Sequence, residues 1–201
     1  MGTVSVFQSV TLDGVMQGVG RADEDARGGF THGGWGDGYS DEVAMQFVGE
    51  GMAATAGLLF GRRTYEDLLG YWTTTPDPNP FTEVLVNAPK WVASRSAGTT
   101  TAYPNTTLLA GEAVETVAAL KPQVDGALTV MGSGELIRSL HEAGLVDEYI
   151  LQIHPIVLGS GTRLFGEGAR TDLTLTHTMT TTTGVMIAQY AVGKTVVGPA
   201  T

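Results

Sequence analysis

Two turns of this sequence place guanidinium and hydroxyl groups directly after short apolar segments. The residues that form them are Arg62, Arg63, Thr64, Ser94 and Arg95. Arginine binds phosphate oxygens through paired, planar hydrogen bonds. Because the chain has only 11 Lys and Arg against 21 Asp and Glu, three arginines at two turns are a local concentration of positive charge. The pattern predicts contacts to a phosphate-bearing ligand; the alternative is two solvated turns whose arginines balance neighbouring acids.

A third turn, Gly132-Ser133-Gly134-Glu135, separates the apolar segment 127–131 from a helical pattern that runs to His141. Glycine lets the backbone approach a phosphate closely, and the first N–H groups of a helix attract an anion. The dinucleotide-binding fingerprint is incomplete, because no third glycine falls three residues after Gly134. The turn is therefore a candidate phosphate contact, and a simple strand-to-helix turn fits the same residues.

One acid and one aromatic residue near the N-terminus are candidates for substrate contact. Asp13 ends the first β-branched segment in Thr11-Leu12-Asp13-Gly14. At a strand end its carboxylate can orient a substrate or deliver a proton, and an ordinary Asp-Gly turn is the alternative. Trp35 lies in residues 15–39, which hold eight glycines without a hydrophobic period and predict a long functional or mobile loop.

The composition excludes several classes of chemistry and partner. With no cysteine, the chain has no disulfide, thiolate zinc site or thiol nucleophile. The four histidines show no metal-ligand spacing, so no metal is expected. A net charge of −10 disfavours nucleic acid and anionic membranes, and no apolar run approaches the roughly 18 residues of a membrane span. The N-terminus lacks a basic leader, so a cytoplasmic protein is expected.

Strand and helix patterns alternate along most of the chain. Strands are expected at 3–10, 58–60, 91–93, 106–109, 127–131 and 149–158, and helices from Ser40 to just before Gly57 and at 63–72, 81–87, 112–121 and 134–141, followed by a hairpin over 173–192. Alternation predicts a largely parallel sheet between two helix layers, and the hairpin makes the sheet mixed. We expect one three-layer αβα domain over residues 1–192 with a tail at 193–201, and ligands at the carboxyl ends of the strands.

These motifs and their order resemble the reductase domain of riboflavin biosynthesis. That domain is the C-terminal half of the bifunctional deaminase–reductase and belongs to the dihydrofolate-reductase-like superfamily. The resemblance covers about residues 3–192 and is closest to stand-alone members without the deaminase half. The matching stretches are 9–14, 61–66, 92–95, 130–134 and 154–161.

The resemblance implies an NADPH-dependent reductase that transfers a hydride to a C=N or C=O bond of a small heterocyclic substrate, such as a pyrimidinone or a pterin. It implies that Asp13 and Trp35 border the nicotinamide and the substrate. It implies a homodimer as well. The cofactor phosphates would be bound by Gly61, Arg62, Arg63, Thr64, Ser94, Arg95, Gly132, Ser133, Gly134 and Glu135.

One position departs from the dihydrofolate reductases within that superfamily. They carry an acid on the first helix, and the corresponding residue here is Met45, with Asp41 and Glu42 as the nearest acids. A non-catalytic NADP-binding protein that acts as a sensor or scaffold therefore stays open as an alternative. An enzyme with a bound flavin is a second alternative.

Overall fold

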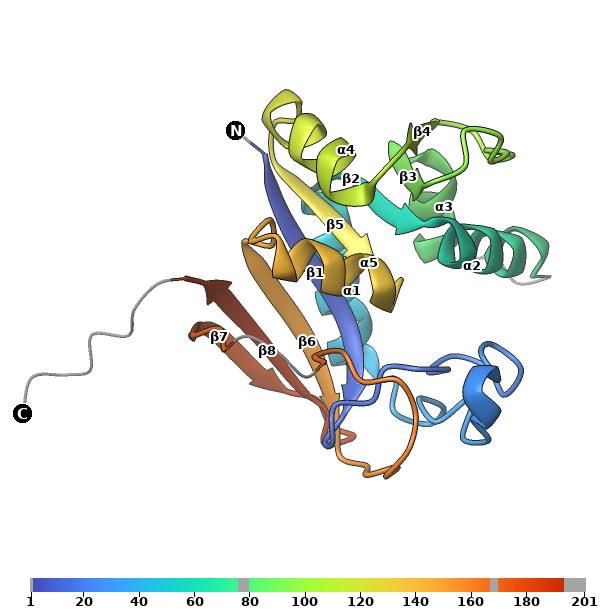
Figure 1. The fold of residues 1–201 in the computed structure, drawn as a ribbon. Helices are drawn as coiled ribbons and strands as arrows, with labels where there is room; N and C mark the ends of the chain where they lie inside the picture. The colour runs from blue at the N-terminus through green and yellow to red at the C-terminus, as the bar shows by residue number, and fades with distance from the viewer. Residues whose placement is uncertain (1, 76–79, 167–169, 194–201) are drawn as a thin grey trace, which may run out of the picture.

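The computed structural model describes residues 2–75, 80–166 and 170–193, so residues 194–201 of the expected tail lie outside the described residues. The strands form one sheet in the order β4-β3-β2-β5-β1-β6-β8-β7 (Figure 1). They are β1 Thr3–Thr11, β2 Thr55–Gly61, β3 Lys90–Ser94, β4 Thr106–Ala110, β5 Ala127–Met131, β6 Glu148–His154, β7 Leu173–Thr180 and β8 Met186–Val192. The helices are α1 Glu42–Ala54, α2 Arg62–Thr74, α3 Pro80–Asn87, α4 Ala113–Leu120 and α5 Gly134–Glu142, with short 3-10 turns at Arg27–Gly29 and Lys121–Gln123.

Parallel pairing dominates the sheet. The strands β1 to β6 pair in parallel, whereas β8 runs antiparallel to both β6 and β7. The β7–β8 hairpin closes through a hydrogen bond from Thr181 N to Val185 O at 2.9 Å, and Gly184 takes the positive φ of +84° that the turn requires. The mixed, mostly parallel sheet with a C-terminal antiparallel hairpin is confirmed.

Two buried apolar clusters hold the helices to the sheet, one on each face. The cluster beneath α4 and α5 includes Val4, Val6, Val10, Val117, Leu136, Ile137 and Leu140. The cluster beneath α1, α2 and α3 includes Met52, Leu58, Phe60, Leu69 and Leu85. Each fully buried Leu or Ile contributes roughly 1.5–3 kcal/mol. Figure 1 shows α4 and α5 in front of the sheet and α1 behind it.

The first helix begins and ends at other residues than predicted. Its N-cap is Asp41 rather than Ser40, because the Asp41 carboxylate accepts a hydrogen bond from Ala44 N at 2.8 Å. The helix ends at Ala54, and Gly57, expected to stop it, lies inside β2. A Cβ at Gly57 would come within 2.4 Å of the Trp91 ring. Gly57 is therefore needed because β2 and the Trp91 ring of β3 approach closely at this point. No local sequence pattern indicates such an approach.

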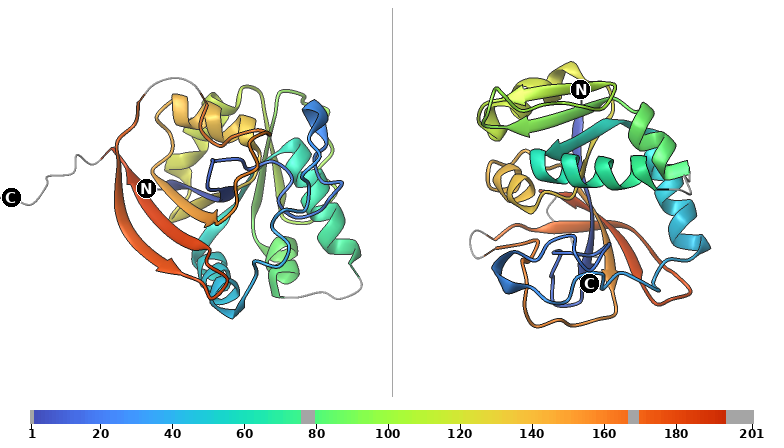
Figure 2. Two further views of the ribbon diagram at one scale, coloured as in Figure 1. Left: turned by 90° about the horizontal axis from the view of Figure 1, so that it is seen from below. Right: turned by 90° about the vertical axis from the view of Figure 1, so that its right-hand side faces the viewer.

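The loop 15–39 packs against the rest of the molecule. Val15, Phe30 and Trp35 form a small buried cluster of their own. The loop lies beside α2 (Figure 2, left), and Arg21 of the loop donates a hydrogen bond to Asp67 of α2 at 2.6 Å. The loop thus forms a wall next to the carboxyl ends of the central strands.

Candidate active site

A cavity of about 840 Å³, called the main cavity below, opens where β1 and β5 separate. The last pair between these strands joins Phe7 and Met131, whereas β1 continues beside β6 as far as Thr11. Gln8 and Ser9 therefore lie beyond the end of β5 and line the main cavity. Ligand sites in open α/β sheets form at such gaps, at the carboxyl ends of strands.

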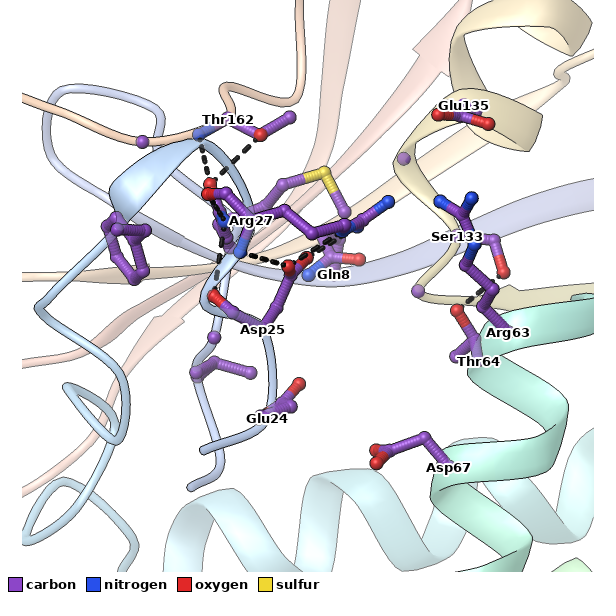
Figure 3. Close-up of a pocket in the computed structure, with 18 of the residues that line it drawn as sticks. Gln8, Glu24, Asp25, Arg27, Arg63, Thr64, Asp67, Ser133, Glu135 and Thr162 are labelled. Carbon is purple, nitrogen blue, oxygen red and sulfur yellow. Dashed lines mark hydrogen bonds and ion pairs between the residues drawn. The ribbon is translucent and has the colours of Figure 1, made fainter. Parts of the chain in front are cut away.

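Two walls face each other across the main cavity (Figure 3). One wall comes from the start of α2 and the turn between β5 and α5, with Arg63, Thr64 and Ser133. The other comes from the loop, with Asp25 and Arg27, and from residues 160–162. The predicted residues that line the cavity are Arg63, Thr64, Gly132, Ser133, Gly134 and Glu135.

A single hydroxyl joins the β5–α5 turn to the start of α2. Ser133 Oγ accepts a hydrogen bond from Gly61 N at 2.7 Å and donates one to Thr64 Oγ1 at 2.8 Å. Ser133 and Gly132 have φ values of +65° and +64°. A Cβ at Gly132 would lie 2.9 Å from Thr64 Cγ2. The two turns predicted separately from the sequence are therefore one unit, and Gly61 contributes to it from outside the cavity lining.

The N-terminus of α5 is at the cavity and has no side-chain cap. The first N–H groups of a helix carry partial positive charge and bind anions. Arg63 is exposed at the same wall and makes no ion pair with any residue that the structure describes. Arg138, one turn further along α5, lines the cavity too. An uncapped helix end beside an unpaired guanidinium is an arrangement suited to phosphate.

The loop wall is built around a paired arginine. Arg27 Nε donates to Asp25 Oδ1 at 2.7 Å, and a second nitrogen of Arg27 donates to the other oxygen of Asp25. This hydrogen bond keeps the pKa of Asp25 below its usual range. Gln17 holds the wall in place, because its Nε2 donates to the carbonyls of both residues and its Oε1 accepts from Thr162 N at 2.9 Å.

Two further acids line the cavity between the loop and α2. The backbone N–H groups of Gly20 and Arg21 donate to Glu24 Oε2, but burial outweighs them and raises the pKa of Glu24. Asp67 accepts from Arg21, whose guanidinium lies 4.6 Å from the ring centroid of Tyr71. Glu24 therefore holds a proton more readily than an ordinary glutamate does.

Besides Gly61, three predicted phosphate contacts do not line the main cavity. Arg62 pairs with Glu66 one helical turn on, at 2.8 Å, and Arg95 pairs with Glu112 at 3.1 Å. Both arginines are exposed, and the Ser94 hydroxyl hydrogen-bonds within its own turn. For these three residues the geometry favours the alternative of solvated, charge-balanced turns.

Both carboxylate oxygens of Asp13 accept hydrogen bonds from neighbouring residues of the chain. Oδ1 accepts from Thr11 Oγ1 at 2.6 Å and from Leu158 N at 3.2 Å, and Oδ2 accepts from Gly159 N at 2.9 Å. The Thr11 hydroxyl and these N–H groups lower the pKa of Asp13 to about 2. Because Asp13 is ionised and is not among the residues lining the cavity, its position does not support the expected proton delivery.

Trp35 is an interior residue of the loop. Its Nε1 donates to the Gln17 carbonyl at 2.7 Å, and its ring meets the His154 ring edge-on with centroids 5.1 Å apart. Only 7% of Trp35 is exposed, and it does not line the main cavity. Its position supports a role in shaping the loop rather than in touching the substrate.

The polar cavity residues that the sequence did not point to include Gln8, Gln17, Glu24, Asp25 and Arg138. Most of them lie in a loop without a period, where no local signal marks a side chain as facing a cavity. Gln8 did carry a signal, since it interrupts an alternating row of valines in the first strand.

The described residues contain neither a membrane-spanning helix nor a cluster of metal-binding side chains. No helix there is long and apolar enough to cross a membrane. In the same ranges, no three His, Cys, Asp or Glu side chains gather so as to hold a metal ion.

A family model and a relative from Bacillus subtilis each match most of this chain. The model described as "RibD C-terminal domain" matches residues 3–187. YyaP of Bacillus subtilis (strain 168) is 34% identical over 139 residues, which cover 66% of this chain and 72% of that protein.

Two solved structures show the same fold. A pyrimidine reductase-like protein from Corynebacterium diphtheriae has a TM-score of 0.65 at 10% identity, covering 96% of this chain and 92% of that one. Dihydrofolate reductase from Enterococcus faecalis, complexed with NADP(H), has a TM-score of 0.56 at 13% identity, with coverage of 96% and 97%. The fold is thus similar to that of dihydrofolate reductase.

Proposed function

This chain belongs to the family of RibD C-terminal domains, and on that premise we propose that it is an NADPH-dependent reductase of a small heterocyclic substrate. The hydride would pass to a C=N or C=O bond. The observation that carries the proposal is the uncapped N-terminus of α5 beside the unpaired Arg63 at one wall of the main cavity. The cavity volume of about 840 Å³ falls within the roughly 300–1,000 Å³ of small-molecule sites.

The residues at this wall fit the phosphates of NADPH. The N–H groups of Gly134 and Glu135 would hold the pyrophosphate at the start of α5. Arg63 and Thr64 would hold the 2′-phosphate, with a guanidinium that no described acid neutralises. This assignment keeps the predicted β5–α5 turn and, of the three predicted arginines, keeps Arg63 but not Arg62 or Arg95.

When bound, NADPH supplies the hydride, and the protein supplies position and a dry site. The loop wall, held by Gln17 and Arg21, would exclude water from the reacting end. Glu24 would hold the proton that the reduced substrate takes up, because burial already raises its pKa. Of Asp41 and Glu42, the two acids nearest to the helix position that is acidic in dihydrofolate reductases, Asp41 is committed to capping α1 and to hydrogen bonds from Thr182.

Calorimetric titration with NADPH and with NADH tests the proposal. The wild type should bind NADPH in the micromolar range and NADH much more weakly. Arg63→Ala should weaken NADPH binding by about tenfold or more and leave NADH binding nearly unchanged. Arg62→Ala is the matched control, and its affinity for NADPH should stay within about twofold of the wild type. Equal losses for both nucleotides in the Arg63 variant would contradict the 2′-phosphate assignment.

A non-catalytic NADP-binding protein is the second candidate. The exposed Met45 at the position of the helix acid favours it. Turnover separates the two candidates: the reductase should consume NADPH with at least one member of a panel of cyclic imines and carbonyl compounds. Binding without turnover across the panel would support the sensor or scaffold. We also propose a homodimer, which sedimentation at several concentrations would test.

A further inference from the structure

Gln8 interrupts an otherwise apolar row on one face of β1. Side chains of a strand alternate between its two faces, so Val4, Val6, Gln8 and Val10 share a face, and the three valines belong to the buried cluster beneath α4 and α5. Gln8 is only 5% exposed. A glutamine at such a position is unusual, because burying an amide is costly unless both of its polar atoms are hydrogen-bonded.

The Gln8 amide is only half satisfied. Its Nε2 donates to the carbonyl of Ser9 at 3.0 Å. Its Oε1 is buried and has no hydrogen-bond partner among the described residues. An unpaired buried acceptor weakens the fold, so a group outside the chain is the simplest reason for keeping it.

The position of Gln8 shows where that group would lie. Gln8 is the first residue of β1 beyond its last pair with β5, and it lines the main cavity between the phosphate-binding wall and the loop wall (Figure 3). The terminal torsion of a glutamine is broad. A small rotation therefore turns Oε1 toward a ligand that fills the cavity.

We propose that Gln8 is a ligand-positioning residue whose Oε1 accepts a hydrogen bond from an N–H group at the reacting end of the bound ligands. The inference rests on the proposed function and deepens it. Two sources offer the same chemistry: the carboxamide of the nicotinamide and a ring N–H of a pyrimidinone-type substrate. In either case Gln8 selects a ligand that presents an N–H donor and disfavours an analogue that presents a methyl group there.

Gln8→Met tests the proposal, because Met has nearly the same length and no acceptor. The first arm measures binding of NADP⁺ and of its 3-acetylpyridine analogue, whose acetyl group has no N–H. If the partner is the nicotinamide, the wild type should prefer NADP⁺ by about tenfold, and the variant should lose that preference by weakening NADP⁺ alone.

The second arm, at saturating NADP⁺, compares 5,6-diaminouracil with 5,6-diamino-1,3-dimethyluracil, which lacks both ring N–H groups. If the partner is the substrate, the preference for diaminouracil over its dimethyl analogue should disappear in the variant. The preference for NADP⁺ over its 3-acetylpyridine analogue should then persist. If Gln8→Met abolishes neither preference, the proposal is overturned. A wild type that binds neither NADPH nor NADP⁺ would instead overturn the proposed function, which is a different result.

Gln152→Met is the matched control. Gln152 of β6 accepts a hydrogen bond from Ser9 Oγ at 3.0 Å and does not line the main cavity. The Gln152→Met variant should leave both preferences unchanged. It should lower the Tm of the ligand-free protein, because the Ser9 hydroxyl loses its acceptor. Gln8→Met should raise that Tm, because it removes an unpaired buried acceptor. A lower Tm for Gln8→Met would contradict the inference that Gln8 Oε1 is unpaired in the ligand-free protein. Gln8→Leu is a second variant for the same comparison of Tm values.

Discussion

Residues that carry the same charge have different roles in this protein. Arg62 and Arg63 are adjacent, yet the first pairs with Glu66 and the second lines the main cavity. Asp13 and Glu24 are both acids near the first strand, yet hydrogen bonds lower the pKa of Asp13 and burial raises that of Glu24. A side chain's surroundings, more than its type, decide what it can do.

Asp13→Asn should lower stability without weakening NADPH binding. The carboxylate joins the end of β1 to residues 158–159 through Thr11 and two backbone N–H groups. Because the folded pKa of about 2 lies below the ordinary aspartate pKa of 3.8, this stabilisation is complete above about pH 4 and is lost as the pH falls toward 2.

Thermal melts at pH 7 and at lower pH check this expectation. The Tm difference between wild type and Asp13→Asn should shrink on acidification. Asp172→Asn is the control, since its partner Arg170 is highly exposed, and it should change the Tm little. An unchanged Tm for Asp13→Asn, with loss of turnover instead, would restore the catalytic interpretation.

At the scale of elements, hydrogen bonds between segments distant in sequence hold the site together. The Ser133 hydroxyl joins the β5–α5 turn to β2 and α2. Arg21 joins the loop to α2 through Asp67 and the Tyr71 ring. Each of these contacts positions a cavity wall. Its loss should therefore change the stability of the fold or the mobility of the wall more than it changes the rate of the reaction.

Ser133→Ala should destabilise the fold by about 1–3 kcal/mol, because the N–H of Gly61 loses its acceptor in a partly buried site. Urea unfolding of the variant measures the change. Ser139→Ala in α5, the helix that begins directly after Ser133, is the control. Ser139 donates only to the Glu135 carbonyl, so its replacement should be close to neutral. Equal effects of the two substitutions would argue against Ser133 as the link between the turns.

Arg21→Ala should loosen the loop wall. The Arg21 side chain is one quarter exposed and its guanidinium hydrogen-bonds Asp67 at 2.6 Å, so its loss removes a contact that holds residues 17–35 against α2. Hydrogen exchange in that segment should accelerate, and exchange in the central strands should not. Arg95→Ala, which breaks an exposed pair, should leave both patterns unchanged. Unchanged exchange in the Arg21 variant would show that the buried cluster of Val15, Phe30 and Trp35 holds the loop without Arg21.

At the scale of the whole molecule, one buried histidine makes folding sensitive to pH. His154 ends β6, is 6% exposed and has no hydrogen-bond partner for either ring nitrogen among the described residues. Trp35 and Tyr39 of the loop contact its ring edge-on. Burial lowers the pKa of His154 from 6.5 to about 4, so the ring is neutral in the folded protein at neutral pH.

Stability should therefore fall as the pH decreases from 6.5 toward 4. In that range the unfolded chain binds a proton at His154 and the folded chain does not, which costs on the order of 2–3 kcal/mol. His154→Phe keeps an aromatic ring in the same space and should flatten this part of the stability curve in urea titrations. His177→Phe, at an exposed position of β7, should keep the slope. A slope that persists in His154→Phe would assign it to other groups.

Local patterns were enough to predict most elements. Alternating β-branched residues and helical periods identified the strands and helices, because those periods follow from backbone geometry. Helix limits were less predictable: Asp41 replaced Ser40 as the cap because only Asp41 also meets Thr182 of the β7–β8 turn.

The sequence by itself determined the class of the fold, the β5–α5 turn and the concentration of arginines near strand ends. Only the tertiary structure decided which side chains share the main cavity. Arg63 enters it and Arg62 does not, because successive helical residues point in different directions. Gln8 lies in it because β5 ends one residue before it in the register, and Asp13 lies outside because residues 158–159 occupy its carboxylate. Such placement depends on contacts between segments more than a hundred residues apart, and no local pattern encodes them.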